Sequence, residues 1–258
     1  MHHKFATALL EYKDKYPLYH ESGDKAVIVV ETRPNVWFPL VIKNIIDKLP
    51  GWKIYIIGSK ISISYLQEVV EHQLNYIVLP SEHLSVKEYN KMMLSERFWE
   101  TFQEEHLLIA QPDCFIIREP MAKHYQYPLI GAVCFSTQED TFIMNGGLSL
   151  RKKSAMLKIC SEILNGNEAD PEDVVFTNAI RMHKMGIPTI ADCNSFAIES
   201  FGNISTAIGV HGTDKNYLNN DKVSAIFASL AKAREELVFS VDTNGNSTTE
   251  LRSKDSFE

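Results

Sequence analysis

Residues 25–59 read KAVIVVETRPNVWFPLVIKNIIDKLPGWKIYIIGS, and this stretch decides the fold class. It opens with a β-branched apolar run at residues 25–30, which is typical of a buried strand. Residues 35–51 place apolar side chains at helical spacing and close on Pro50-Gly51, a helix stop signal. A second apolar run, residues 52–59, halts at Gly58-Ser59. A strand, a helix and another strand in this order predict a βαβ unit with parallel strands.

The following segments continue the alternation of strands and helices. They predict a helix at 63–72, a strand at 74–80, an amphipathic helix at 85–102 and a strand within HLLIAQPDCF, residues 106–115. Strands alternating with helices of this length indicate a mostly parallel central sheet covered on both faces. The predicted fold class is therefore α/β, with a Rossmann-like nucleotide-binding half at residues 25–115.

The second half of the chain, residues 116–239, has shorter and more polar segments. A strand is predicted at 128–135, and a short strand, a glycine turn and a helix at 142–164. A helix is predicted from Pro171 to Gly186, followed by loop-rich segments and a last helix at about 221–238. Residues 1–24 are expected to form a helical extension, and the polar residues 240–258 a disordered tail, on either side of one domain at 25–239.

Composition excludes several classes of protein. With 258 residues, of which 45 % are apolar, the chain can bury a sizeable core. A net charge of −7 argues against a nucleic-acid groove, which needs a basic face. No apolar run approaches the roughly 20 residues that span a bilayer, and the N-terminus does not read as a signal peptide. The four cysteines lack CxxC spacing, which indicates free thiols in a reducing compartment; a cytoplasmic protein is expected.

Polar residues follow three of the predicted strands, at what must be one edge of a parallel sheet. Thr32 and Arg33 follow the first strand, Gly58 ends the second, and Gln111 and Asp113 follow the fourth. Ligands of open parallel sheets bind at this edge, outside the carboxyl ends of the strands. Arg33 suits a diphosphate or a base carbonyl, and Gly58 allows a flat ring to approach the backbone. A surface salt bridge is the other interpretation of Arg33.

Asp113 has two interpretations. An aspartate after a strand is most often a turn or cap residue. In an enzyme that uses nucleotide sugars, the same carboxylate would bind a divalent ion that bridges the diphosphate. Such enzymes usually carry an Asp-x-Asp pair here, whereas this chain has Gln111, a weaker ligand for hard cations. The substitution makes metal dependence moderate at most.

Two further motifs lie in the second half. NGGLSLR, residues 145–151, places Gly146 and Gly147 where a sugar ring could lie against the backbone, with Arg151 opening the next helix; a plain turn before a helix is the alternative. Glu172 and Asp173 lie in the first helical turn after Pro171, where the helix dipole stabilises carboxylates and would keep one ionised as a general base.

His211, in IGVHGT, is the last candidate residue. A lone histidine near glycines is more often an ordinary loop residue. A late histidine could also complete a metal site with Asp113 or contact a diphosphate.

Seven segments in a fixed order resemble one known family: VVETRP (29–34), SVKEYNKMMLSERFW (85–99), LLIAQPDCF (107–115), IGA (130–132), NGGLSLR (145–151), PEDVVF (171–176) and GVHG (209–212). The family is a group of GT-A-type glycosyltransferases, first described as a domain of unknown function, in bacteria, algae, fungi and large viruses. The chain is most similar to the capsid-glycan glycosyltransferases of chloroviruses, including a xylosyltransferase type. The resemblance covers about residues 25–213.

The resemblance implies an inverting transfer of a sugar, such as xylose, from a nucleotide-sugar donor, UDP-linked in the first instance, to a glycan acceptor. It implies a GT-A-like fold, with the donor held at the ends of the first, second and fourth strands. Asp173 matches the position of the catalytic base and Glu172 is its neighbour. A Mn²⁺ or Mg²⁺ ion at Asp113 and His211 is the cofactor that it implies, and a viral protein of this kind would act in the host cytoplasm.

Two other functions remain open. A nucleotide- or glycan-binding module of the same fold, without appreciable turnover, is favoured by Gln111 and disfavoured by the Glu172-Asp173 pair. A nucleotidyltransferase would need a glycine-rich basic loop after the first strand, and ETRPNVWF is not such a loop.

Overall fold

The structure is a computed structural model, and it describes residues 23–35, 37–134, 138–163, 170–199, 202, 205–212, 237–241 and 247–251. The predicted N-terminal helical extension, except Gly23 and Asp24, lies outside these residues. So does the predicted last helix as far as Glu236. Within the described part of the chain, no helix is both long and apolar enough to cross a membrane.

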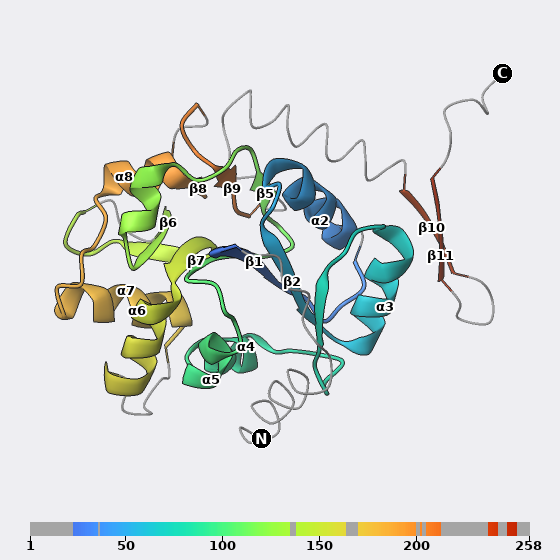
Figure 1. The fold of residues 1–258 in the computed structure, drawn as a ribbon, viewed down its shortest axis with the longest axis horizontal. Helices are drawn as coiled ribbons and strands as arrows, with labels where there is room; N and C mark the ends of the chain where they lie inside the picture. Colours follow the sequence, from blue (N-terminus) through green and yellow to red (C-terminus); the bar gives the residue numbers. More distant parts are fainter. Residues whose placement is uncertain are drawn as a thin grey trace.

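The centre of the molecule is a six-stranded sheet in the order β3-β2-β1-β4-β7-β6 (Figure 1). Its strands are β1 (Lys25–Val30), β2 (Lys53–Gly58), β3 (Asn75–Val78), β4 (His106–Ala110), β6 (Leu129–Cys134) and β7 (Ile143–Lys152). β1 pairs in parallel with β2 and β4, and β2 pairs in parallel with β3. β7 is antiparallel to both of its neighbours, so it alone runs against the other strands. The predicted α/β class with a mostly parallel central sheet is confirmed.

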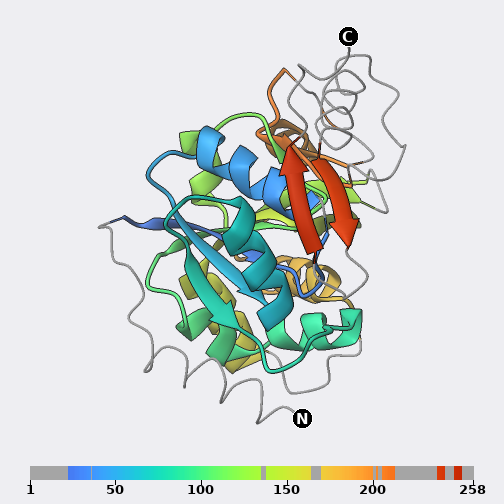
Figure 2. The same ribbon diagram turned by 90° about the vertical axis from the view of Figure 1, so that its right-hand side faces the viewer.

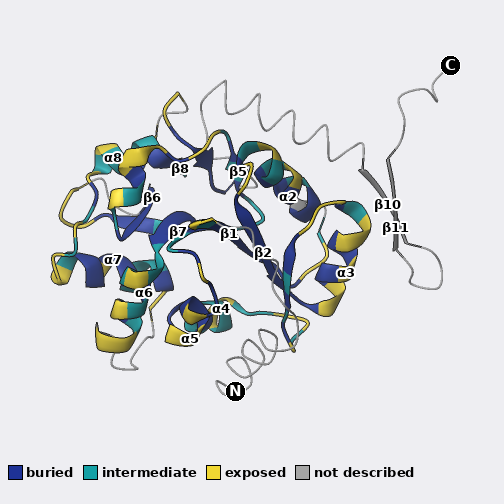
Figure 3. Cartoon of the chain, viewed as in Figure 1, coloured by how far each residue is buried: buried dark blue, intermediate teal, exposed yellow. Residues whose placement is uncertain are grey.

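Helices cover both faces of this sheet, because the connections between its strands run on opposite sides of it (Figures 1 and 2). One face carries α2 (Trp37–Lys48) and α3 (Lys60–Val69), which join β1 to β2 and β2 to β3. The other face carries α4 (Val86–Met93), α5 (Glu96–Glu100), α6 (Lys153–Lys158) and α7 (Glu172–Met182). The sheet strands between them are almost wholly buried, and the exposed residues lie on the outer helix surfaces (Figure 3).

The helix predicted at 85–102 is two helices, so this prediction is wrong in its continuity. α4 begins at its N-cap Ser85, whose side chain accepts the Glu88 N–H while the Glu88 carboxylate accepts the Ser85 N–H. It ends at Met93, and α5 starts after Ser95. The Trp99 indole donates to the Met93 carbonyl, 2.8 Å away, and so binds the end of α4 to the buried face of α5. Helical periodicity cannot reveal this bend, because both pieces keep an apolar face.

The segment 142–164 also differs from the prediction. The glycines of NGGLSLR do not form a turn between a strand and a helix; they lie inside β7, a strand of ten residues. The pairing with β6 shifts here, from Gly131 opposite Ser149 to Val133 opposite Met144, so β7 bulges. Arg151 therefore belongs to the strand and does not open α6. A π-helix, η2 (Ile159–Ile163), continues α6.

A small three-stranded sheet lies beside the main sheet and carries part of the site. It consists of β5 (Phe115–Ile116), β9 (Gly209–Val210) and β8 (Ala197–Ile198) in that order. A 3₁₀ helix, η1 (Ala122–Gln126), and α8 (Ile190–Phe196) complete this half of the molecule; α8 was not predicted. α7 ends at Met182, four residues before the predicted stop at Gly186.

Strands β10 (Leu237–Val241) and β11 (Ser247–Leu251) pair antiparallel as a separate hairpin. This hairpin differs from the expectation of a disordered tail from residue 240 onward. The four cysteines are free, and three of them are buried.

Candidate functional site

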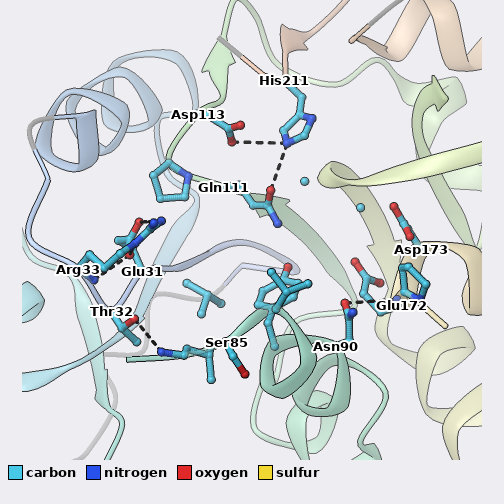
Figure 4. Close-up of a pocket in the computed structure, with 18 of the residues that line it drawn as sticks. Glu31, Thr32, Arg33, Ser85, Asn90, Gln111, Asp113, Glu172, Asp173 and His211 are labelled. Atoms are coloured by element: carbon cyan, nitrogen blue, oxygen red, sulfur yellow. Dashed lines mark hydrogen bonds and ion pairs between the residues drawn. The ribbon is translucent and has the colours of Figure 1, made fainter. Parts of the chain in front are cut away.

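A pocket of about 1120 Å³ opens at the carboxyl ends of β1 and β4 (Figure 4). Its walls come from the loop after β1, the start of α4, the glycine bulge of β7 and the first turn of α7. Nine of the eleven residues that the sequence analysis selected line it: Thr32, Arg33, Gln111, Asp113, Gly146, Gly147, Glu172, Asp173 and His211. The sheet edge therefore gathers side chains that are up to about 180 positions apart in the chain.

Gly58 does not line this pocket, which corrects the expectation of a contact with a flat ring. A Cβ at this position would lie 2.4 Å from the Glu31 carbonyl oxygen and 2.5 Å from the Ser62 hydroxyl. The Ser62 hydroxyl donates to that same carbonyl, and Ser59 caps α3 by accepting the Ser62 N–H. Gly58 thus allows close packing between the end of β1 and the start of α3.

One wall of the pocket is a loop organised by the carboxylate of Glu31. Arg33 donates to it from Nε and from a terminal nitrogen, each at 3.0 Å, and its backbone N–H adds a third bond at 2.8 Å. Asn35 adds a fourth at 3.0 Å. These hydrogen bonds raise the pKa of Arg33 and fix one edge of its guanidinium. The Arg33 side chain is 69 % exposed, so the rest of the group faces the pocket. The alternative interpretation, a salt bridge, is present as well.

Thr32 lies beside this loop, but its polar atoms have partners within the protein. Its hydroxyl accepts the Leu84 N–H at 3.1 Å, and its carbonyl accepts the Ser59 hydroxyl at 2.7 Å. Thr32 therefore ties β1 to the segment that leads into α4 and lines the pocket with its remaining surface.

The end of β4 brings Gln111, Asp113 and His211 together, as Figure 4 shows. The Nε2 atom of His211 lies 3.1 Å from Gln111 Oε1 and 3.4 Å from Asp113 Oδ1. Asp113, Cys114 and His211 form a group whose possible ligand atoms all lie within 4.8 Å of one another. The Cys114 thiol donates to the Gly147 carbonyl, and burial raises its pKa well above the ordinary value, so it is a poor ligand. The donors that remain are a carboxylate, an imidazole and an amide oxygen.

The two glycines of β7 are required by side chains that come from elsewhere. A Cβ at Gly146 would lie 2.1 Å from Glu172 Oε1. A Cβ at Gly147 would lie 2.1 Å from His211 Nε2 and 2.7 Å from Gln111 Oε1. Each glycine therefore makes room for one polar group of the site. Both glycines line the pocket, but they lie inside β7 and do not form the predicted turn.

Arg151 lies behind the pocket wall and is fully buried, which corrects its prediction as a donor-binding residue. Its guanidinium forms a bidentate ion pair with Glu172, at 2.7 and 2.9 Å. The rings of Trp99 and Phe176 lie 5.6 and 5.3 Å away from it. Burial lowers the pKa of Arg151, but the charge and hydrogen bonds of Glu172 outweigh burial and raise it.

The ion pair separates the roles of the two acidic residues in α7. The Glu172 carboxylate is held by Arg151, whereas Asp173 has no ion pair within hydrogen-bonding distance in the described structure. The sequence analysis expected the helix dipole to lower the pKa of Asp173. That direction is wrong: burial raises this pKa, and the neighbouring charge of Glu172 raises it further. Desolvation and a like charge here exceed the effect of the helix end.

Tyr89, Asn90 and Glu199 are among the pocket residues that the sequence analysis did not select. Tyr89 and Asn90 come from α4, where the resemblance to SVKEYNK was noted without assigning them roles. Burial raises the pKa of Tyr89, which keeps its hydroxyl protonated. Glu199 gave no signal in the sequence, because it lies in a short loop and reaches the site only through the small sheet.

The structure defines an α/β protein with a pocket lined by polar residues at the carboxyl edge of its sheet. A family model of proteins of unknown function, DUF5672, matches residues 73–211, which is more than half of the chain. The chain belongs to this family. The match includes Gln111, Asp113, Asp173 and His211 and leaves out β1 and β2. No curated protein matches the chain.

Proposed function

We propose that the protein is an inverting glycosyltransferase, which transfers a sugar from a nucleotide-sugar donor, UDP-linked in the first instance, to a hydroxyl of a glycan. The observation that carries the proposal is the arrangement of the pocket. An arginine at the end of β1, the Asp113–His211 pair and an unpaired carboxylate, Asp173, line the same cavity. Its volume of about 1120 Å³ lies just above the usual range of about 300–1,000 Å³ for small-molecule sites, so the pocket has room for a nucleotide sugar.

In this proposal the donor lies across the sheet edge. The exposed edge of Arg33 binds the nucleotide part, and the Gln111–Asp113 turn underlies the diphosphate. NGGLSLR and PEDVVF resemble segments of the glycosyltransferase family named above, and this resemblance supports placing the sugar near Gly146 and Gly147. Xylose is one candidate for that sugar.

A Mn²⁺ or Mg²⁺ ion fits the residues present at the diphosphate position. Asp113 Oδ1 and Gln111 Oε1 both lie within 3.4 Å of His211 Nε2. Donor sets rich in oxygen suit these ions. When bound, the ion would neutralise the charge that develops on the leaving diphosphate. Asp113 and His211 would hold it, with Gln111 as a weaker neutral ligand.

Asp173 is the general base of the proposed reaction. It takes the proton of the acceptor hydroxyl while the hydroxyl oxygen attacks the anomeric carbon. The bond from that carbon to the diphosphate oxygen breaks, and the nucleoside diphosphate leaves with the electron pair. A raised pKa suits this role, because a stronger base accepts the proton more readily. Arg151 holds Glu172 away from the acceptor, so only one of the two carboxylates acts.

A binding module remains the second candidate, and Gln111 is the observation that favours it. A panel of UDP- and GDP-sugars, followed by chromatography for donor hydrolysis or transfer, separates the two. Nucleotide binding without cleavage of any donor would favour the module. The absence of any affinity for UDP, GDP or CDP in calorimetry, with and without Mn²⁺, would exclude donor binding.

The Asp173→Asn variant tests the base. General-base assistance is typically worth about 10²–10⁴-fold, so kcat should fall by about that factor while UDP affinity stays near that of the wild type. Asp173 must be ionised to act as a base, and its pKa is raised. Wild-type kcat/KM should therefore fall at low pH, and the midpoint of that fall should lie above the ordinary pKa of aspartate. The variant should lack this limb of the pH profile.

Asp170→Asn is the matched control, because Asp170 is exposed and lies just before the same helix. It should leave both the rate and the pH profile unchanged. If Asp173→Asn keeps more than about a tenth of wild-type turnover, or if NMR of the product shows a retained anomeric configuration, the assignment is wrong.

A further inference from the structure

The imidazole of His211 is held between acidic groups on both sides. Nε2 faces Gln111 Oε1 and Asp113 Oδ1, as described above. On the other side, Nδ1 lies 3.3 Å from Glu199 Oε1. The His211 side chain is only 5 % exposed and that of Glu199 15 %, so water has limited access to this contact.

Backbone pairing builds the contact between Glu199 and His211. β8 and β9 are parallel, with Ala197 opposite Gly209 and Ile198 opposite Val210. The next residues in this register are Glu199 and His211, and the His211 N–H donates to the Ile198 carbonyl at 2.8 Å. Neighbouring residues of paired strands lie about 5 Å apart. The two side chains therefore meet because of the small sheet, and not through a flexible surface contact.

Two atoms of this pair lack hydrogen-bond partners among the described residues. His211 Nδ1 and Glu199 Oε2 are both buried, and neither makes a hydrogen bond. The 3.3 Å separation of Nδ1 and Oε1 is an ion-pair distance without hydrogen-bond geometry. A buried carboxylate and a buried ring nitrogen side by side are unfavourable unless they bond to each other or to a ligand. At a separation of 3.3 Å, a Glu199 oxygen can accept an Nδ1–H once the two groups are aligned.

We propose that Glu199 is the positioning residue of His211. Without a metal ion, Gln111 Oε1 accepts the Nε2–H of His211. When a divalent ion takes the place of that proton, Glu199 accepts the Nδ1–H, holds the ring in the tautomer whose Nε2 carries the free lone pair, and so aims that lone pair at the space shared with Asp113. Histidines that bind metals usually donate their other N–H to a carboxylate or carbonyl in this way. The inference rests on one part of the proposed function, the divalent ion at His211 and Asp113. Glu199 itself touches neither donor nor acceptor in this role.

Mn²⁺ binding to the protein, without any substrate, tests the role of Glu199. Chelator-treated wild-type protein is titrated with Mn²⁺, and free Mn²⁺ is read from its electron paramagnetic resonance signal. Loss of an outer carboxylate partner typically weakens metal affinity by about 10–100-fold, so Glu199→Ala should raise the Kd by that factor. Glu199→Gln keeps an acceptor oxygen for Nδ1–H and should lose less. Glu68→Ala, an exposed glutamate of α3, is the charge-matched control and should bind Mn²⁺ as the wild type does.

The tautomer of His211 gives a second reading that a merely structural contact would not change. Long-range ¹H–¹⁵N correlation spectra, recorded with saturating Mg²⁺, which is diamagnetic, and at a pH where the ring is neutral, should show His211 protonated on Nδ1 in the wild type. His211→Gln identifies the signal by its loss. Glu199→Ala should shift the ring toward a mixture of tautomers, and Glu199→Gln should restore the wild-type pattern in large part.

The outcomes are separable from those of the proposed function. Unchanged Mn²⁺ affinity in Glu199→Ala overturns the inference, as does a Mg²⁺-loaded wild-type His211 that carries its proton on Nε2. A wild-type protein that binds no Mn²⁺ overturns it too. Calorimetry with UDP in the presence of chelator reads donor binding independently, so the proposed function can stand when the role of Glu199 fails. If Glu199→Ala does not fold, the Glu199→Gln titration and the wild-type spectrum still decide.

Discussion

Two bidentate Arg–Glu pairs lie on the two sides of the pocket, and they do different work. Glu31 and Arg33 are two residues apart in one loop, with the arginine side chain 69 % exposed and the glutamate 3 %. Arg151 and Glu172 are 21 residues apart on β7 and α7, at 0 % and 4 %. The first pair leaves a guanidinium open to the pocket, whereas the second is almost wholly buried, with Arg151 behind the pocket wall and Glu172 in it.

The difference teaches that a salt bridge is defined by what surrounds it. An exposed pair is screened by water and contributes about 0–1 kcal/mol to stability. A buried pair gains little over apolar residues of the same shape, yet removal of one partner leaves an uncompensated charge in the interior. The Glu31–Arg33 pair can therefore serve recognition at little cost to folding. The buried Arg151–Glu172 pair fixes the position of the Glu172 carboxylate, and the fold depends on both partners.

Arg151→Met should give the largest effect. It leaves the buried Glu172 carboxylate without its partner, at a cost of about 3–5 kcal/mol in the free energy of unfolding. Urea denaturation followed by circular dichroism measures this loss. The double variant Arg151→Met, Glu172→Leu should recover most of it, because no charge is left unpaired. A double variant as unstable as the single one would show that packing, and not charge, explains the loss.

Gly146→Ala sharpens the comparison from the pocket side. Its Cβ would overlap Glu172 Oε1, so either the ion pair or β7 must move, at a cost of about 1–3 kcal/mol. Gly147→Ala creates the same overlap with His211 and Gln111 and should weaken Mn²⁺ binding as well. Gly23→Ala is the control, since its nearest atom would be 4.0 Å away. Thermal denaturation of all three variants measures the effect on stability, and Mn²⁺ titration of Gly146→Ala and Gly147→Ala measures the effect on metal affinity. An equal loss of Mn²⁺ affinity in both variants would contradict the different roles of the two glycines.

Arg33→Ala should have the smallest effect on stability, about 1 kcal/mol, because the arginine side chain is largely exposed and the buried Glu31 carboxylate keeps the backbone N–H of residue 33 and Asn35 as donors. If Arg33 binds the nucleotide, the loss of hydrogen bonds from a charged group should weaken UDP binding by about 10–100-fold, the equivalent of about 1.5–3 kcal/mol. Arg97→Ala, at an exposed arginine of α5, provides the control for lost charge. Denaturation and UDP calorimetry on both variants measure the two effects. UDP affinity equal to that of the wild type would limit Arg33 to holding its loop.

Much of the site could be predicted from the sequence, because strand ends are visible in it. Each apolar run that became β1 or β4 passes directly into polar residues, and parallel strands must place those residues at one edge. Thr32, Arg33, Gln111 and Asp113 were found in this way. Gly58 ends a strand at the same edge and was misassigned, because nothing local shows that α3 packs against it.

Other features depended on contacts between distant segments. The position of Arg151 in a strand follows from the pairing of β7 with β4 and β6, which turns the glycine motif into a bulge. Glu199 entered the site only because β8 lies beside β9. The sign of the Asp173 pKa shift depends on burial and on Glu172, and neither can be calculated from a place in the first turn of a helix.

The sequence by itself determined the α/β class, the parallel order of the first strands and the edge at which polar side chains gather. These follow from hydrophobic periodicity and from the geometry of βαβ units, which are properties of short segments. Only the tertiary structure decided which of two adjacent acids is free, which arginine faces the pocket and which glycine serves packing. Such distinctions are set by desolvation and by partners up to 100 residues away, as for Gln111 and His211, and no local pattern contains them.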